Sequence, residues 1–292
     1  MLYDVRHRTT LSYEQVVSIS HHVLHLEPRD TPKQRRLQFD LHVEPAPTQQ
    51  SSSMDFFGNC VRYLALQEPH QRLVVESRSR IDVAPRDGPV DLPSSPAWES
   101  VAASLVAADV AVLDPLQFAF ASPYVALDRE ARDYALPSFS GGRPILEAAM
   151  NLTSRIFEDF EYQGGVSDVS TPVRQVLKMR KGVCQDFAHL EIACLRSIGL
   201  AARYVSGYLL THPPPGRPKL VGSDASHAWL SVWAGELGWI DLDPTNNVIP
   251  DVEHITLAWG RDYGDVSPMN GFIIGGGTHS VTVGVDVTPV AI

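Results

Sequence analysis

The sequence predicts an α+β fold in which an antiparallel β region comes first, helices follow, and a second group of strands comes after them. Over residues 1–83 apolar and polar side chains alternate in several stretches, as they do along Leu37–Val43. Ile145–Asp159 instead places its apolar residues on one face of a helix. Alternation returns in Ser226–Trp233 and Trp239–Asp243. The residues between them, Gly235–Gly238, are typical of a hairpin loop.

Residues 1–83 form the first predicted domain, a sandwich-like antiparallel β domain. Within it, Phe57–Cys60 is typical of a tight turn between two strands, and Leu73–Ile81 alternates like a strand. The tail alternates again over Ser280–Val287, so we expect residues 278–292 to return to this domain and complete it. Residues 84–97 contain four prolines and a glycine, which predicts a linker.

Residues 98–250 form the predicted core domain, and residues 251–292 form the segment that leads back to the β domain. Helical patterns cover residues 97–112, 128–135 and 145–159. Ala201–Leu210 has the pattern of a strand. Pro213–Gly216 after it predicts a loop that could border a cleft.

Cys184 stands where a buried helix is predicted to begin. The residues from Cys184 to Ile198 are apolar on more than one face, and Gly182 is suited to ending the preceding helix in a left-handed conformation. Unpaired backbone N–H groups at the helix start, with Lys181 nearby, favour the thiolate form that acts as a nucleophile. A lone cysteine is more often a small buried hydrophobic residue, so this segment alone leaves the role of Cys184 open.

His227 and Asp243 are the partners that a nucleophilic cysteine needs. His227 begins the first strand of the predicted hairpin and Asp243 ends the second, so the hairpin brings both residues to one rim. Cysteine, histidine and aspartate can then act as nucleophile, base and orienting carboxylate. Asp241 lies on the same strand face as Asp243, and spacing alone leaves both aspartates open as the third residue.

The order and spacing of three segments resemble the motifs of the transglutaminase-like superfamily, in a bacterial branch described as cysteine proteases. The three segments are Gly182–Ala188, Ser226–Trp229 and Asp243–Asn246. Tyr3–Thr9 and Leu26–Arg29 resemble the N-terminal β region of that branch, and Gly260–Val266 resembles its C-terminal segment. The resemblance implies a papain-like core that carries Cys184 on a helix and His227 and Asp243 on an antiparallel sheet. It also favours Asp243 over Asp241.

The resemblance points to further residues around these three. Animal transglutaminases use a tryptophan upstream of the cysteine, but no tryptophan lies between Trp98 and Cys184, which makes Tyr162 a candidate replacement. Gln185 and Asp186 are candidates for supporting the reacting groups. Candidates for binding the substrate are Arg261, Asp262, Tyr263, Asp265 and Trp229. Arg261 could pair with a peptide carboxylate in a two-pronged geometry.

Our first functional hypothesis is a cysteine-dependent amide or peptide hydrolase that forms a thioester acyl-enzyme. One alternative is transglutaminase-type transfer of the acyl group to an amine, which would use the same three residues. Another is a non-catalytic peptide-binding or scaffold module, which an intact Cys-His-Asp set argues against. We therefore expect a peptide or protein substrate and no cofactor.

Composition restricts the partners. A net charge of −10 argues against nucleic acid and against an anionic membrane. The sequence shows no signal segment and no apolar run of membrane-spanning length. Its three cysteines are too few for a disulfide framework, so we expect the protein to reside in the reducing cytoplasm. The sequence leaves the oligomeric state open, a homodimer included. We expect no metal site, because no metal-ligand spacing accompanies the scattered histidines His7, His21, His22, His25 and His42.

Overall fold

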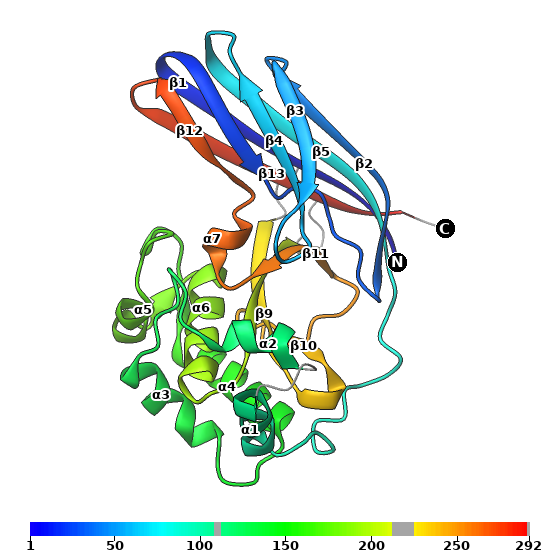
Figure 1. Cartoon of the computed structure of the whole chain (residues 1–292), viewed down its shortest axis with the longest axis vertical. Helices are drawn as coiled ribbons and strands as arrows, with labels where there is room; N and C mark the ends of the chain where they lie inside the picture. The colour runs from blue at the N-terminus through cyan, green and yellow to red at the C-terminus, as the bar shows by residue number, and fades with distance from the viewer. Residues whose placement is uncertain (108–111, 212–224, 291–292) are drawn as a thin grey trace, which may run out of the picture.

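The computed structural model describes residues 1–107, 112–211 and 225–290. A large twisted sheet occupies one end of the molecule, and helices packed around a smaller sheet occupy the other (Figure 1). The architecture is therefore mixed α and β, with an antiparallel sheet formed by the N-terminal part of the chain.

The large sheet is built on one long strand, β1. Its seven strands are β1 (Leu2–Leu24), β2 (Gln34–Glu44), β3 (Gln49–Met54), β4 (Cys60–Leu66), β5 (His70–Val83), β12 (Met269–Gly275) and β13 (His279–Val290). The first half of β1 pairs with β5 and β13, and the second half pairs with β4 and β12. The C-terminal strand β13 thus lies beside the N-terminal strand in an antiparallel ladder.

The pairing of β1 changes between Ser12 and Val17, and the two halves of the sheet share one apolar core. Leu73 and Val75 of β5 enter this core from one half, and Leu64 of β4 enters it from the other. The β region is therefore one continuous hydrogen-bonded sheet whose two halves share an apolar core.

Helices form the middle of the chain. They are α1 (Trp98–Ala107), α2 (Leu113–Leu116), α3 (Arg129–Ala135), α4 (Ile145–Asp159), α5 (Val173–Met179) and α6 (Cys184–Ser197). Residues 84–97, before α1, contain no helix or strand. The helix predicted over residues 145–159 is confirmed at both ends, because its apolar stripe and its flanking Pro144 leave little choice of boundary.

The smaller sheet has the strand order β10-β9-β8-β11 and packs against α6. Its strands are β8 (Ala202–Leu209), β9 (Ala225–Trp233), β10 (Trp239–Leu242) and β11 (His254–Gly260). β11 corrects one expectation: residues 251–292 do not all return to the β region, because β11 pairs with β8 and buries Ile255 and Leu257 in the core beside α6. The predicted loop Pro213–Gly216 lies outside the described residues.

The two parts of the molecule are packed together. Val5 of β1 and Val287 of β13 belong to the same apolar cluster as Leu190 of α6. The Tyr208 hydroxyl on β8 also lies 3.0 Å from Nδ1 of His7 on β1, and both side chains are buried. The N-terminal sheet therefore helps to hold the core sheet in place.

Candidate active site

Cys184 is the first residue of α6, and a local network fixes this helix start. The Asp186 carboxylate accepts hydrogen bonds from the Val183 backbone N–H at 2.7 Å and from the Ser167 hydroxyl at 2.6 Å. Asp186 is nearly fully buried, and burial raises its pKa. Its side chain therefore caps α6. The half-buried Cys184 stands at the N-terminal end of this helix, where the helix dipole is positive.

Gly182 has a different role from the one predicted. The left-handed residue that ends α5 is Arg180, with φ of 55°. A Cβ atom on Gly182 would lie 2.7 Å from the Asp186 carboxylate. Glycine is needed here because Asp186 approaches the backbone closely, and not because the backbone turns.

His227 and Asp243 are paired across the end of the β9–β10 hairpin. Nε2 of His227 lies 2.8 Å from Oδ2 of Asp243, and both side chains are buried. The turn after β10 positions the carboxylate, because its Oδ1 accepts from the backbone N–H groups of Thr245 at 2.9 Å and Asn246 at 3.2 Å. Asp241 instead accepts from the Trp229 indole and the Ser231 hydroxyl.

Cys184 completes a group of three with this pair. Burial lowers the pKa of His227, but hydrogen bonds and charges from Asp243 and Cys184 outweigh that effect and raise it to about 10. Burial likewise raises the pKa of Asp243, yet its hydrogen bonds with His227 and His254 bring it well below its usual range. Because Nε2 of His227 faces Asp243, Nδ1 is the ring nitrogen left for the thiol. The geometry suits an imidazolium held between the Asp243 carboxylate and the Cys184 sulfur.

Two further residues contact Asp243 and were not among the sequence candidates. Nε2 of His254 on β11 lies 2.9 Å from Oδ2 of Asp243, and the Asn246 side-chain amide donates to the same oxygen at 2.7 Å. Asn246 lies in the third motif segment, so the sequence could have pointed to it as a residue of the site. His254 gave none, because only the register of β11 against β8 brings it to the site.

Within the part of the chain that the structure describes, the same cluster is a place where a metal ion could bind. The ligand atoms of His227, Asp243 and His254 all lie within 4.8 Å of one another. Both histidine Nε2 atoms are within hydrogen-bonding distance of Oδ2 of Asp243, so a hydrogen-bond network accounts for these short distances. The expectation that the protein uses no metal stays a prediction.

The other two candidates near Cys184, Tyr162 and Gln185, differ in their contacts. Tyr162 lies on β6 (Glu161–Tyr162), where burial raises its pKa and the charge of Cys184 adds to the effect. Its hydroxyl has no hydrogen bond to a described residue, and its role beside the thiol stays a prediction. The Gln185 side chain donates to the Val169 carbonyl at 3.3 Å, away from the His227–Asp243 pair.

The predicted substrate-binding residues are largely occupied by structural contacts. The Arg261 guanidinium forms a two-pronged ion pair with Asp265, at 2.9 and 2.8 Å. Asp262 is buried and caps α7 (Tyr263–Val266) while accepting from the Tyr124 backbone N–H. Binding of a substrate carboxylate by Arg261 would require Arg261 to leave Asp265, and that role stays a prediction.

Trp229 is fully buried and covers the paired residues from one side. Its ring is stacked on His227 with centroids 6.0 Å apart and meets His254 edge-on at 5.2 Å. Gly207 on β8 makes room for it, because a Cβ atom there would lie 2.4 Å from the indole. Trp229 therefore shields the His227–Asp243 hydrogen bond from water, and a role in binding the substrate stays a prediction.

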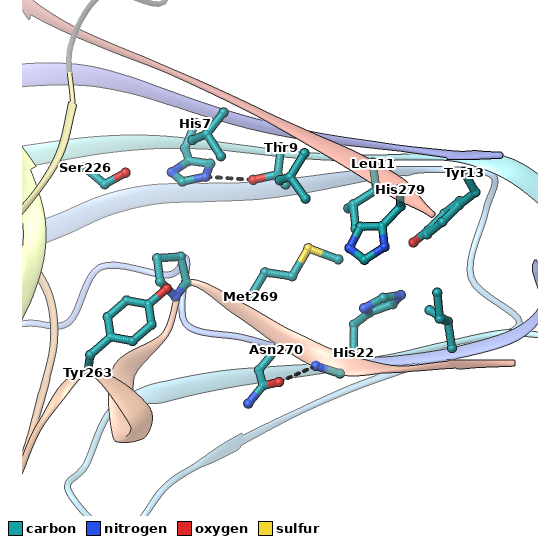
Figure 2. A pocket seen from close by; sticks show the side chains of 15 residues that line it. His7, Thr9, Leu11, Tyr13, His22, Ser226, Tyr263, Met269, Asn270 and His279 are labelled. Carbon is teal, nitrogen blue, oxygen red and sulfur yellow. Dashed lines mark hydrogen bonds between the residues drawn. The ribbon is translucent and has the colours of Figure 1, made fainter. Parts of the chain in front are cut away.

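A pocket of about 410 Å³ begins beside the strand that carries His227. Ser226, the residue before His227, forms part of its wall, and the pocket extends between β1, β12 and β13 (Figure 2). Its lining is mainly apolar, with Leu11, Met269 and Ile273 among the contributors. Burial lowers the pKa of His7 to about 4, and it does the same for His22, so both rings in this wall are uncharged at neutral pH.

The fold and the site define a class: a protein with a cysteine at the start of a buried helix and a histidine–aspartate pair on the adjoining sheet. Comparison with known proteins agrees. The profile of the transglutaminase-like superfamily matches residues 132–244, and that of the bacterial transglutaminase-like N-terminal region matches residues 3–82. The chain belongs to the transglutaminase-like superfamily.

Relatives and solved structures extend the match to the whole chain. An uncharacterized protein of Mycobacterium tuberculosis (strain H37Rv) is 43% identical, over 98% of this chain and 92% of its own length. One from Mycobacterium leprae is 32% identical over 98% of both chains. A "putative cysteine protease" from Cytophaga hutchinsonii shares the fold with a TM-score of 0.76 and 22% identity, covering 99% of this chain and 90% of that one.

A shorter match involves an enzyme with a named activity. The protein-glutamine gamma-glutamyltransferase of Pseudomonas aeruginosa is 38% identical over 73 residues, which is 25% of this chain and 11% of that protein. Separately, none of the described helices is long and apolar enough to cross a membrane.

Proposed function

We propose that this protein is a cysteine-dependent amide hydrolase that acts on peptides. The observation that carries the proposal is the position of His227, which lies between the buried Asp243 carboxylate and the Cys184 thiol. A charged histidine beside a cysteine stabilises the thiolate, which is the form that attacks a carbonyl carbon.

In the first half of the reaction the Cys184 thiolate adds to the amide carbonyl. The oxygen becomes an anion, and the Cys184 backbone N–H at the start of α6 is placed to donate to it, with the Tyr162 hydroxyl as a second donor. His227 then gives its proton to the leaving nitrogen. The C–N bond breaks, the amine leaves, and the acyl group remains on Cys184 as a thioester.

In the second half His227 takes a proton from water as the water oxygen attacks the thioester. The C–S bond breaks, the acid product leaves, and Cys184 returns to the thiolate as His227 returns to its charged form. Asp243 stays ionised throughout and holds the imidazole by its Nε2 atom.

Transfer of the acyl group to an amine is the second candidate, and the match to a named glutamyltransferase favours it. The two reactions share the thioester and differ only in whether water or an amine attacks it. A non-catalytic peptide-binding module would keep the fold but form no thioester.

The pocket of Figure 2 indicates the kind of substrate. Its wall includes Ser226, the residue next to His227, but neither Cys184 nor His227, so it would take a part of the substrate that lies beyond the bond that is cleaved. Its apolar lining and the uncharged His7 and His22 favour an apolar side chain over a charged one.

A peptide library with mass detection tests the proposal, with added cadaverine and with a Cys184→Ala control. Hydrolysis adds the mass of water across one bond, whereas transfer attaches cadaverine to the acyl product. We expect hydrolysis, at sites flanked by apolar residues. Cadaverine adducts as the main product would favour the second candidate, and peptide binding without any product from wild type would favour the module.

A further inference from the structure

A second cavity, of about 550 Å³, lies on the face of the core sheet that points away from α6. Along β9, Leu230 and Val232 face the core beside α6, so Ser231 between them faces this cavity. The linker after β5 and the loop around Gln34 form its other walls. Neither Cys184 nor His227 lines it, but Trp229 and His254 do, so the cavity adjoins the candidate active site without containing the nucleophile or its base.

Arg203 of β8 is the central residue of this cavity. Its guanidinium carbon lies over two rings, 4.4 Å from the Trp239 centroid and 3.7 Å from the Trp259 centroid. Only 8% of the residue is exposed. Its Nε donates to the Ser231 hydroxyl at 3.3 Å, but its two terminal nitrogens have no hydrogen bond and no ion pair with any described residue.

This arrangement is costly for a structural arginine. A buried charge destabilises a protein unless it is paired and its donors are satisfied. Burial lowers the pKa of Arg203 to about 9, which still leaves it charged at neutral pH. The stacked tryptophans hold the plane of the guanidinium and leave its fork of two N–H groups aimed into the cavity rather than at a carboxylate of the chain.

None of the other described charges around the cavity forms an ion pair with Arg203. Arg86 is paired with Asp251. Asp241 accepts from the Ser231 hydroxyl and the Trp229 indole and is not within ion-pair distance of Arg203. Lys33 and Asp114 at the exposed edge offset each other in sign. These charges sum to zero, with Asp241 offsetting Arg203 from beyond ion-pair distance, so the unpaired guanidinium fork suits one carboxylate better than a doubly charged group such as phosphate.

We propose that this cavity binds a small monocarboxylate whose carboxylate pairs with the two terminal nitrogens of Arg203 and whose planar apolar part packs against Trp239 and Trp259. A carboxylate matches the guanidinium fork with two parallel hydrogen bonds. The same chemistry could come from a free aromatic acid or from the C-terminus of a peptide that ends in an aromatic residue.

Calorimetric titration of the full-length protein tests this site with charged and uncharged probes of the same shape. Indole-3-acetate is compared with indole-3-acetamide, and the dipeptide Gly-Trp with its C-terminal amide. We expect the acid to bind at least about tenfold more tightly than its amide in the indole pair. If Gly-Trp also binds more tightly than its amide, the site accepts peptide termini; if it does not, the site takes free acids. Both results support the proposal.

Variants locate the binding. Arg203→Met should weaken indole-3-acetate by at least about tenfold, and Arg203→Lys should recover little, because lysine lacks the fork. Arg129→Met, in a side chain that is 92% exposed, is the matched control and should bind as wild type does. If the Arg203 variants do not fold, Trp239→Leu takes their place in the test. It keeps the charge of Arg203 and removes one wall of the cavity, so it should also weaken the binding of indole-3-acetate. Equal affinity for indole-3-acetate and indole-3-acetamide, or no saturable binding of either acid at millimolar concentration, would overturn the proposal.

Discussion

Asp243 is the residue at which the separate parts of the candidate site meet. Its two oxygens accept from His227, from His254 and from the turn residues Thr245 and Asn246. A carboxylate with this many donors stays ionised and fixed in orientation. The cysteine, histidine and aspartate could be predicted from their sequence motifs, because each motif is local. His254 could not be predicted, since its contact depends on how two distant strands pair.

His254 should act as a positioning residue through Asp243. Replacing it with alanine removes one donor from the carboxylate, so we expect His254→Ala to lower kcat by roughly tenfold with little change in KM, and His254→Gln to recover part of the loss. Steady-state kinetics on the best library peptide measures this. Were KM to rise instead while kcat held, His254 would be acting on substrate binding.

Glu191 on α6 should lower the stability of the folded protein at neutral pH. It is fully buried, and burial raises its pKa to about 8; Thr153 is its hydrogen-bond partner, and its second oxygen has none. Between about pH 4 and 8 the unfolded chain loses this proton and the folded chain keeps it, so stability falls as pH rises through that range. Glu191→Gln preserves the shape without the ionisation. We expect a higher Tm than wild type at pH 8 and a similar one at pH 4, by calorimetry; equal Tm values at both would contradict this.

At the scale of elements, β8 depends on a glycine where it is crossed by Trp229. A Cβ atom on Gly207 would lie 2.2 Å from the Ile255 carbonyl oxygen of the neighbouring strand and 2.4 Å from the Trp229 ring. Neither contact can move without separating β8 from β11 or displacing the cover over His227. We expect Gly207→Ala to lower the free energy of unfolding by about 1–3 kcal/mol.

Gly164→Ala is the matched control for that change, because a Cβ atom there meets nothing within 4 Å. Denaturant unfolding of both variants makes the comparison. A Gly207→Ala protein as stable as Gly164→Ala would mean that the β8–β11 pairing is looser than the structure shows.

The elements also show where sequence patterns suffice. The helix over Ile145–Asp159 could be predicted to the residue, because its periodicity is strong and proline flanks it. The alternation in residues 254–260 is just as visible, but it does not say which sheet the strand joins. Burial of Ile255 and Leu257 beside α6 decides that question, and only the assembled core shows it.

At the scale of the whole molecule, the ion pair of His227 and Asp243 should shape the pH dependence of stability. The pKa of His227 is raised to about 10 in the folded protein, so its contribution is complete below about pH 6.5 and is lost as pH rises toward 10. Asp243 has a lowered pKa, so its contribution is present above about pH 4 and is lost in acid. Both contributions are therefore complete together between about pH 4 and 6.5.

We expect the difference in unfolding free energy between wild type and His227→Gln to be largest in that window and to shrink steadily toward pH 10. Taking the difference removes the effect of Glu191, which both proteins share. Urea titrations at closely spaced pH values measure it. A difference that stays constant from pH 6 to 10 would mean that His227 is not charged at neutral pH.

The alkylation rates of the three thiols test most directly whether a charged His227 activates Cys184. Cys194 is fully buried, and burial raises its pKa, whereas Cys60 is half-buried in the β region. With iodoacetamide and peptide mass detection at neutral pH, we expect Cys184 to react at least about tenfold faster than Cys60 and Cys194, and His227→Ala to remove most of that advantage. Faster reaction at Cys60 or Cys194, or an unchanged Cys184 rate in His227→Ala, would contradict the assignment.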